Sequence, residues 1–142
     1  MTKSSETAYD LVVFGATSFV GQILTRYLLE TYGVGQSVKW AIAGRSESKL
    51  NTLKGELGSK AKDLPVILAD ASDEAALKAM CEQARVIIST VGPYALYGEP
   101  LVQACVRSGT DYCDLTGEVQ WIRKMVERYE EEAKSSGARI VH

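Results

Sequence analysis

Residues 9–21, with the sequence YDLVVFGATSFVG, constrain the fold of this chain more than any other stretch. Leu11 to Phe14 is a short apolar run rich in β-forming residues, as expected for a central strand that is covered by helices on both faces. The chain then reaches Gly15, where a sharp turn is expected, and from Phe19 onward apolar residues recur with the period of an α-helix. We therefore predict a strand, a glycine turn and a helix in immediate succession.

The predicted helix carries its apolar residues at the spacing of a single face. These residues are Val20, Ile23, Leu24, Tyr27 and Leu28. A helix that begins at the glycine turn directs its unpaired backbone N–H groups and the positive end of its dipole into that turn. The arrangement favours the binding of a phosphate or pyrophosphate group.

The glycine turn has the spacing G-x-x-S-x-x-G. Gly15 permits the tight turn, and Gly21 allows the helix to lie close against the sheet. Ser18 stands at the middle position, where dinucleotide-binding motifs more often have glycine, and its hydroxyl can cap the helix. The motif leaves two interpretations open: a pyrophosphate site, or a tight strand-to-helix turn that holds no ligand.

The composition excludes several classes of protein. The 142 residues suffice for one domain, and a net charge of −2 gives no reason to expect a nucleic-acid partner. No apolar run has the length of a transmembrane helix, so we expect a cytoplasmic location. Cys81, Cys105 and Cys113 form no C-x-x-C pair, and the sequence has one histidine, which predicts reduced thiols and no metal site.

The rest of the chain alternates between strand and helix patterns. Further strands are predicted at residues 37–43, 65–69, 86–91, 112–115 and 139–141. Helices are predicted between them, one opening at Pro100 and the last ending at Gly137. Strict alternation with apolar strands predicts an α/β fold of three layers (αβα), with a doubly wound, mostly parallel sheet of strand order 3-2-1-4-5-6.

Ligands of such a sheet bind outside the carboxyl ends of the strands, which makes the loops there informative. After the second predicted strand an NAD-binding domain would have an acidic residue, but here Arg45 and Ser46 follow, with Lys49 one turn later. A cation beside hydroxyl groups suits the 2′-phosphate of NADP(H), where a charge-assisted pair contributes about 1.5–3 kcal/mol. The alternative is that Arg45 and Lys49 are solvated surface cations.

The loops after the third, fourth and fifth strands add further candidates. Asp70 would lie beside the adenine, or it could cap the next helix. Gly92 allows the backbone to approach the cofactor, and Tyr94 could reach the nicotinamide or substrate side or simply pack at a strand-ending turn. After the fifth strand come Asp114 and Thr116, and we expect Thr116 to cap the last helix.

Candidate catalytic residues are scarce. A short-chain dehydrogenase needs a tyrosine with a lysine four residues later, and none of the seven tyrosines has one. His142 stands at the end of the sequence, directly after the last predicted strand, and we do not expect it to act as a catalyst. The sequence therefore assigns no catalytic residue.

Four segments together carry a family resemblance: GATSFVG after the first predicted strand, AGR after the second, STVGPY after the fourth and DLTGE after the fifth. With these motifs the chain from residue 9 to residue 142 resembles the N-terminal domain of the saccharopine dehydrogenase-like oxidoreductases, in the branch that includes trans-acting enoyl reductases. The resemblance implies a Rossmann domain for NADP(H) at residues 9–142. The polar N-terminal sequence separately predicts a flexible tail at residues 1–8. The resemblance also implies a substrate domain that this fragment lacks.

The resemblance assigns cofactor contacts position by position. The pyrophosphate would be contacted by Gly15, Thr17, Ser18, Phe19, Val20 and Gly21. The 2′-phosphate would be held by Arg45 and Ser46, and the nicotinamide side would be lined by Gly92, Pro93 and Tyr94. Ser18 departs from the more usual glycine, which bears on how tightly the pyrophosphate is held.

Three functions fit these features. The first is hydride transfer between NADP(H) and a small-molecule or lipid-like substrate, with a fragment that binds cofactor but is inactive alone. The second is a non-catalytic redox sensor or interaction module that binds NADP(H), and the third is true saccharopine reductase chemistry. The missing domain is also where a homo-oligomer could form.

Overall fold

The computed structural model describes residues 7–142, so most of the predicted tail, residues 1–6, lies outside the described part. The strands are β1 (Tyr9–Phe14), β2 (Trp40–Gly44), β3 (Val66–Leu68), β4 (Ala84–Ser89), β5 (Asp111–Cys113) and β6 (Ile140–Val141). The helices are α1 (Phe19–Tyr32), α2 (Glu47–Leu57), the 3₁₀ turn η1 (Ser59–Ala61), α3 (Glu74–Gln83), α4 (Tyr94–Tyr97), α5 (Glu99–Ser108) and α6 (Val119–Ser136).

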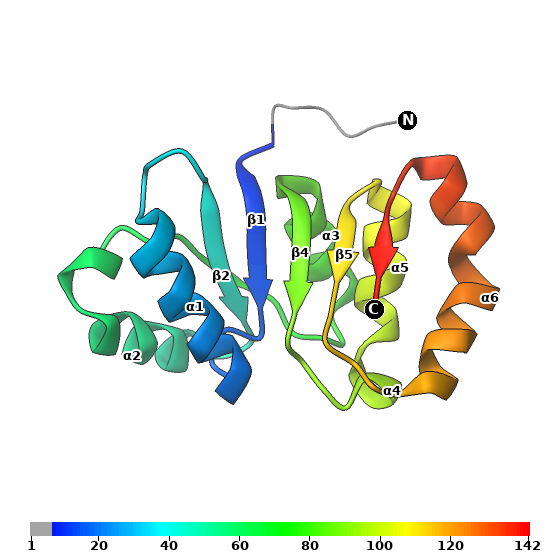
Figure 1. Ribbon diagram of the computed structural model, residues 1–142, viewed down its shortest axis with the longest axis horizontal. Coiled ribbons are helices and arrows are strands. Elements are labelled where there is room, and N and C mark those ends of the chain that lie inside the picture. The colour runs from blue at the N-terminus through cyan, green and yellow to red at the C-terminus, as the bar shows by residue number, and fades with distance from the viewer. Residues whose placement is uncertain (1–6) are drawn as a thin grey trace.

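The strands form one parallel sheet in the order β3-β2-β1-β4-β5-β6. The chain moves outward from β1 to β3, returns across the sheet to β4 and moves outward again to β6 (Figure 1). Strand order therefore reverses between β1 and β4, where the crevice of a doubly wound fold opens. This topology confirms the predicted α/β fold and strand order.

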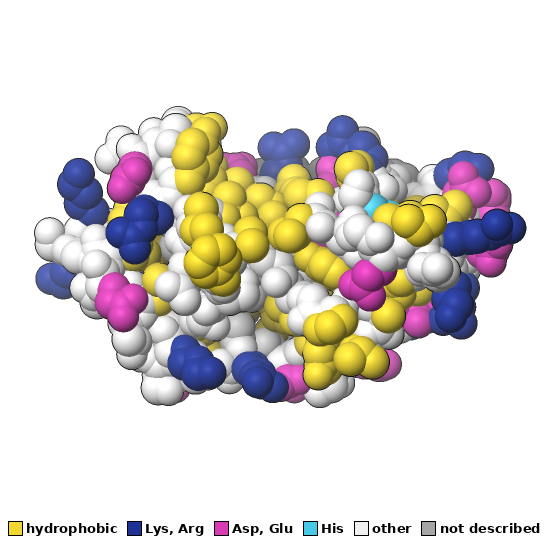
Figure 2. All heavy atoms as spheres, turned by 60° about the horizontal axis from the view of Figure 1, so that its bottom comes forward, with side chains coloured by type: hydrophobic (Ala, Val, Ile, Leu, Met, Phe, Trp, Pro, Cys, Tyr) yellow, Lys and Arg dark blue, Asp and Glu magenta, His cyan; other side chains and the backbone are white. Residues whose placement is uncertain are grey.

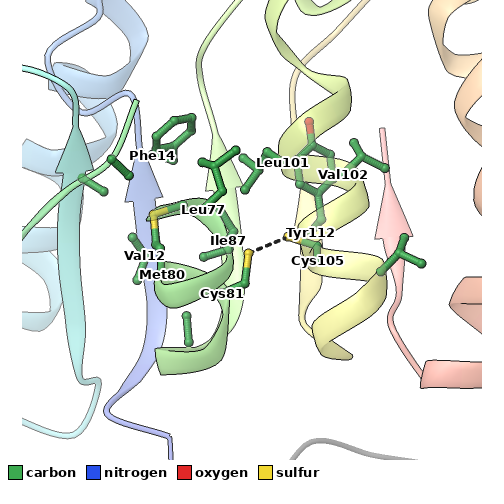
Figure 3. Packing of buried hydrophobic residues seen from close by; sticks show 14 of the residues in the cluster. Val12, Phe14, Leu77, Met80, Cys81, Ile87, Leu101, Val102, Cys105 and Tyr112 are labelled. Carbon is green, nitrogen blue, oxygen red and sulfur yellow. Dashed lines mark hydrogen bonds between the residues drawn. The ribbon is translucent and has the colours of Figure 1, made fainter. Parts of the chain in front are cut away.

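Two hydrophobic clusters lie on opposite faces of the sheet. On one face, Val12 and Phe14 of β1 pack with buried residues of α3, α5 and α6. On the other face, Val13 and Ile42 pack with buried residues of α1, α2 and η1. Figure 3 shows part of the first cluster, in which the sulfur atoms of two buried cysteines on α3 and α5 lie 3.6 Å apart. The central strand β1 is thus covered on both sides, as its unbroken apolar sequence predicts.

The observed strands differ from the predicted ones by one to three residues at their ends, and the second and fourth differ most. The second begins at Trp40 rather than residue 37, because the preceding backbone bonds to a side chain, with the N–H of Lys39 donating to Asp10 Oδ2 at 2.9 Å. The fourth ends at Ser89 rather than Val91, because Thr90 leaves the strand to contact the glycine turn. The short elements η1 and α4 are not predicted from the sequence.

Only part of the apolar face predicted for α1 packs on the sheet: Leu28 is buried and Leu24 packs against the same cluster, whereas the other members of that face are exposed. The residues of α1 that are buried are Gly21, Thr25, Leu28 and Leu29. The side chains of Ile23 and Tyr27 are 56% and 55% exposed. Gly21 sets this rotation, because it lies directly against the backbone of the glycine turn and draws its own side of the helix toward β1.

Within residues 7–142, none of the helices is long and apolar enough to cross a membrane.

Candidate functional site

The carboxyl ends of β1, β2 and β4 meet at one edge of the sheet, and backbone hydrogen bonds tie their loops together. The N–H of Gly15 donates to Ala43 O at 3.0 Å, and the N–H of Thr90 donates to Phe14 O at 2.9 Å. The glycine turn after β1 is therefore fixed from both neighbouring strands. This is the edge at which a doubly wound fold binds its ligand.

The two glycines of the turn are required by its geometry. Gly15 has a φ of +90°, a backbone conformation that other residues adopt at a cost. A Cβ atom on Gly21 would lie 2.1 Å from Gly15 O, closer than two atoms can approach. The first turn of α1 therefore lies in direct backbone contact with the loop, and only glycine fits at residue 21.

Ser18 stabilises the turn from within. Its hydroxyl accepts a hydrogen bond from the N–H of Gly21 at 3.0 Å, so Ser18 is the N-cap of α1, and it donates to Thr90 Oγ1 at 3.0 Å. The hydroxyl of Thr90 in turn donates to Gly15 O at 2.8 Å. The serine that departs from the usual glycine thus belongs to a hydrogen-bonded link between the loops after β1 and β4.

Three backbone N–H groups at this turn remain available to a ligand. Within residues 7–142, no hydrogen bond engages the N–H groups of Thr17, Phe19 and Val20. They lie at the N-terminus of a helix of 14 residues, where the helix dipole also favours an anion. The side chain of Phe19 is 81% exposed, so it leaves the turn open. The residues at this turn fit a pyrophosphate group.

Arg45 and Asp70 extend this half of the edge. Arg45 follows β2 directly and has an exposed side chain, and Ser46 is the N-cap of α2, accepting from the N–H of Lys49 at 3.3 Å. Asp70 follows β3 and accepts hydrogen bonds from the hydroxyl and N–H of Ser72. These two bonds lower the pKa of Asp70 from its usual value, and the nearby charge of Arg45 lowers it further. Arg45 and Asp70 follow adjacent parallel strands and therefore lie at the same edge of the sheet.

The structure excludes the helix-cap alternative for Asp70. The N-cap of α3 is Asp73, whose carboxylate accepts from the N–H of Ala76 at 3.0 Å. Asp70 instead forms a turn with Ser72, one of its oxygens accepting both bonds.

The loop after β4 has an open part and a buried part. Gly92 and Pro93 are exposed and are joined by a cis peptide bond. Tyr94 is only 5% exposed, its hydroxyl donates to Ser89 O at 2.9 Å, and its ring centroid lies 5.4 Å from that of Trp121. Burial raises the pKa of Tyr94 above its usual value. Its phenol is part of the core, which is the packing alternative that the sequence left open.

Glu118 braces the loop after β4 from the loop after β5. Its carboxylate oxygens accept hydrogen bonds from the N–H of Tyr94 at 2.7 Å and the N–H of Ala95 at 3.0 Å, at the start of α4. Thr116 does not cap α6, contrary to the sequence prediction. The N-cap of that helix is Glu118, and the Thr116 hydroxyl accepts from the Glu118 N–H at 3.0 Å because the intervening loop turns back on itself.

Asp114 is the centre of a second network at this end of the edge. Its Oδ2 accepts from the Tyr112 hydroxyl at 2.7 Å and lies 2.9 Å from His142 Nδ1, while Oδ1 accepts from the N–H of Thr116 at 3.1 Å. Burial alone would raise the pKa of Asp114, but the hydrogen bonds from His142, Thr116 and Tyr112 outweigh burial and hold it below its usual value. The network therefore keeps a buried carboxylate ionised.

Sequence reasoning missed the positioning residues Thr90, Glu118 and Trp121. Thr90 and Glu118 belong to the STVGPY and DLTGE motifs, so the motifs marked the segments without showing which contacts they make. Trp121, on α6, contacts the rings of both Tyr94 and His142, with ring centroids 5.4 and 5.1 Å away. No periodicity in the sequence indicates that this tryptophan joins the two loops.

Comparison with known proteins identifies the family of this chain and solved structures that share its fold. The model of the family described as the saccharopine dehydrogenase NADP binding domain matches residues 11–141. A trans-acting enoyl reductase of Mycobacterium tuberculosis strain H37Rv is 44% identical over 137 residues, which are 96% of this chain and 32% of that protein. The chain thus spans about a third of the length of this curated relative.

Solved structures show the same fold at low sequence identity. Apo saccharopine dehydrogenase (L-Glu forming) from Saccharomyces cerevisiae has a TM-score of 0.69 at 18% identity, over 93% of this chain and 26% of that one. AtPrR2 with NADP+ and (+)pinoresinol has a TM-score of 0.55 at 16% identity, over 97% of this chain and 50% of that one.

Proposed function

The chain belongs to the saccharopine dehydrogenase NADP-binding domain family, and from that premise we propose that it positions NADP(H) for hydride transfer to or from a substrate held by another part of the protein. NADP(H) is the cofactor of this domain. In the proposed reaction the nicotinamide of NADPH supplies a hydride to a polarised C=C or C=O bond, a proton completes the reduction, and NADP+ remains.

The main support for this proposal is the glycine turn between β1 and α1, where backbone N–H groups that have no partner within residues 7–142 are free to bind a pyrophosphate. The N–H groups of Thr17, Phe19 and Val20 would donate to the pyrophosphate, while the link from Ser18 to Thr90 keeps the turn in place before the cofactor arrives. Gly15 and Gly21 allow the turn to pack closely against Thr90 and α1 to pack closely against the turn. The Ser18 hydroxyl bonds to Thr90 and Gly21, and the Ser18 N–H donates to Gly15 O at 3.0 Å. We therefore propose that Ser18 shapes the turn and does not donate to the pyrophosphate.

The 2′-phosphate would lie beside Arg45 and Ser46. The guanidinium group is exposed and stands at the start of α2, whose dipole also favours an anion. Asp70 would lie on the adenine side, where the carboxylate oxygen that does not bond to Ser72 can accept from the exocyclic amine. These roles divide recognition of the adenosine half between the ends of β2 and β3.

The nicotinamide would lie against Gly92 and Pro93, which are exposed next to the loop that Glu118 braces. Tyr94 would support this surface from below through its contact with Trp121 rather than touch the cofactor. The loop after β4 would thus present backbone, not a titratable side chain, to the ring.

An enoyl substrate, small or lipid-like, is the class we propose. The curated relatives at 44% identity are trans-acting enoyl reductases, whereas the likeness to saccharopine dehydrogenase is at 18% identity. Those relatives are about three times as long as the matched region, and we propose that a further domain of this protein holds the substrate, completes the active site and forms any homo-oligomer contact.

The test uses the protein at the full length that its gene encodes, beside the 142-residue chain. With NADPH and a crotonyl thioester as the enoyl probe, the full-length protein is expected to oxidise NADPH, and the short chain is expected to bind it without turnover. Saccharopine and its semialdehyde precursor with glutamate form the competing substrate arm. Turnover in that arm alone would replace the enoyl assignment, and binding without turnover of any probe would favour a non-catalytic NADP(H)-binding module.

A further inference from the structure

One face of the sheet carries an apolar row that runs from edge to edge. Strand register aligns six residues, one from each strand, on the face where α1 and α2 pack. From β3 to β6 the members of this apolar row are Val66, Ile42, Val13, Ile88, Cys113 and Val141. Successive side chains on a strand point to opposite faces, and residues paired across neighbouring strands point to the same face. The six side chains therefore lie side by side on one face of the sheet.

The row is covered at one end and bare at the other. Ile42 and Val13 are 0% exposed beneath α1 and α2, Ile88 and Cys113 are partly exposed, and Val141 is 61% exposed. In Figure 1, α1 lies in front of the β1 and β2 side, and β4, β5 and β6 have no described helix in front of them. The helices that do cover these three strands, α3, α5 and α6, pack on the opposite face.

The bare end continues onto α1. Val20, Ile23 and Tyr27 lie on the side of this helix that is turned away from its buried residues, and they are 39%, 56% and 55% exposed. Figure 2 shows hydrophobic side chains gathered on the α1 side and across the middle of the molecule. An apolar surface this extended is unusual on a protein that works without a partner.

The dimensions of the bare end suit one helix. Strands lie about 4.8 Å apart and packed helices about 8–10 Å apart, so a helix beside α1 would lie over β4 and β5. A polar border is present as well, because Asp111 and Arg139 form an ion pair in the neighbouring row of the same face. A helix with an apolar stripe and polar flanks matches this surface.

We propose that an amphipathic helix from the polypeptide beyond His142 covers the bare end of the apolar row in the full-length protein. The matched region is 32% of the curated relative, so two thirds of that protein lie outside it and can supply such a helix. The last residue of β6, Val141, is itself a member of the row, so a continuing chain would leave the domain at this surface. The inference does not depend on the cofactor or the reaction.

Cys113 reports directly on this surface. Its thiol belongs to the bare end, whereas Cys81 and Cys105 are 0% exposed and serve as internal references. Burial raises the pKa of Cys113, so labelling with a maleimide is carried out under mildly alkaline conditions and read by peptide mapping. In the 142-residue chain we expect Cys113 to react faster than the two reference cysteines.

In the protein at the full length that its gene encodes, Cys113 is expected to react at least about tenfold more slowly, because labelling then requires the covering helix to open. Equal rates in the two proteins would overturn the proposal, as would a gene that ends at residue 142. A short chain that is dimeric by light scattering and protects Cys113 would also overturn it, because a second copy would then be the occupant.

A substitution gives an independent check. Val141→Asp places a charge on the bare end, and Val126→Asp places one on α6, where the side chain is 46% exposed. Both variants are expected to leave the urea midpoint of the short chain nearly unchanged. In the full-length protein Val141→Asp alone is expected to lower the midpoint and to restore Cys113 labelling. Equal behaviour of the two variants there would contradict the proposal.

Discussion

At the edge formed by the carboxyl ends of the strands, the half around β1, β2 and β3 (the open half) differs from the half around β4, β5 and β6 (the satisfied half) in how its polar groups are used. Around β1, β2 and β3 the edge leaves polar groups unused: three backbone N–H groups lack a partner within residues 7–142, and Arg45 is exposed. Around β4, β5 and β6 the carboxylates are engaged by donors of the protein itself, although the indole Nε1 of Trp121 is buried without a hydrogen-bond partner among residues 7–142. Glu118 accepts from the start of α4, and Asp114 joins Tyr112 to His142.

This difference indicates that the first half can bind a ligand, whereas the second half fixes the conformation of two loops. Unused donors in the first half can be satisfied by a phosphate without breaking any bond of the protein. In the second half a ligand that competed for Glu118 or Asp114 would have to break bonds that fix two loops. Thr90 connects the halves, because its hydroxyl reaches from the end of β4 to the glycine turn.

Gly21→Ala tests the open half at its most constrained point and is expected to have the largest effect. The new Cβ would meet Gly15 O at 2.1 Å, so α1 must move, at a cost of about 3 kcal/mol or more in the free energy of unfolding. Gly55→Ala is the matched control, since its Cβ meets nothing within 4 Å, and it should stabilise α2 by about 0.5–1 kcal/mol. Urea unfolding followed by circular dichroism measures both.

Asp114→Asn tests the satisfied half. The amide loses the charge that accepts from Tyr112 and faces His142, and we expect a loss of about 3 kcal/mol at neutral pH. The pKa of Asp114 is lowered in the folded protein, so its contribution is complete above its unfolded value of about 4 and is lost as the pH falls through the folded value.

The difference in unfolding free energy between wild type and Asp114→Asn should therefore shrink as the pH falls from neutral to strongly acidic. Asp63→Asn, at an exposed aspartate outside the network, controls for the loss of one negative charge. A difference that stays constant over this pH range would show that the carboxylate charge is not what stabilises the loops.

Arg45→Ala tests the cofactor side of the comparison. Removing one charge-assisted contact to the 2′-phosphate should weaken NADPH binding about ten- to hundredfold and leave NADH binding unchanged. Arg26→Ala, which removes an exposed arginine from α1, should leave both affinities as in wild type. If Arg45→Ala and Arg26→Ala weaken NADPH equally, the effect is one of net charge and the assignment to Arg45 is wrong.

Thr90→Val tests the connection between the halves and should have the smallest effect on stability. Valine keeps the shape but loses the hydrogen bonds to Gly15 O and Ser18, at a cost of about 1 kcal/mol. Its larger consequence should be weaker NADPH binding, because the glycine turn is then less well held. Thr90→Ser, which keeps the hydroxyl, should bind NADPH nearly as tightly as wild type, and calorimetry measures all three proteins.

The sequence predicted the fold well because alternation of apolar strands and helices leaves few topologies. Periodicity could not predict which side of α1 faces the sheet, because apolar residues occur on two sides of this helix. A single backbone contact, that of Gly21 with Gly15 O, selects the side that packs. The exposed side is apolar for a different reason, which the covering helix proposed above would supply.

The sequence predicted which segments form the candidate site, but it did not predict the hydrogen bonds that hold their loops in place. Gly15, Gly21 and Arg45 follow from the spacing of strands and turns, because the strand ends alone bring them to one edge. The contacts of Glu118 with the start of α4 cross 24 positions in the sequence, and a carboxylate gives no local signal of which backbone groups it will accept from. Tyr94 was equally ambiguous, because a tyrosine after a strand suits a ligand pocket and a core alike.

The most direct test of the account is a calorimetric titration of this chain with NADPH and, in parallel, with NADH. The account predicts that both bind at one site and that NADPH binds about ten- to hundredfold more tightly, the value of one charge-assisted contact to the 2′-phosphate. Equal affinities, or the absence of binding by either dinucleotide, would contradict the claim that the open half of the edge is an NADP(H) site.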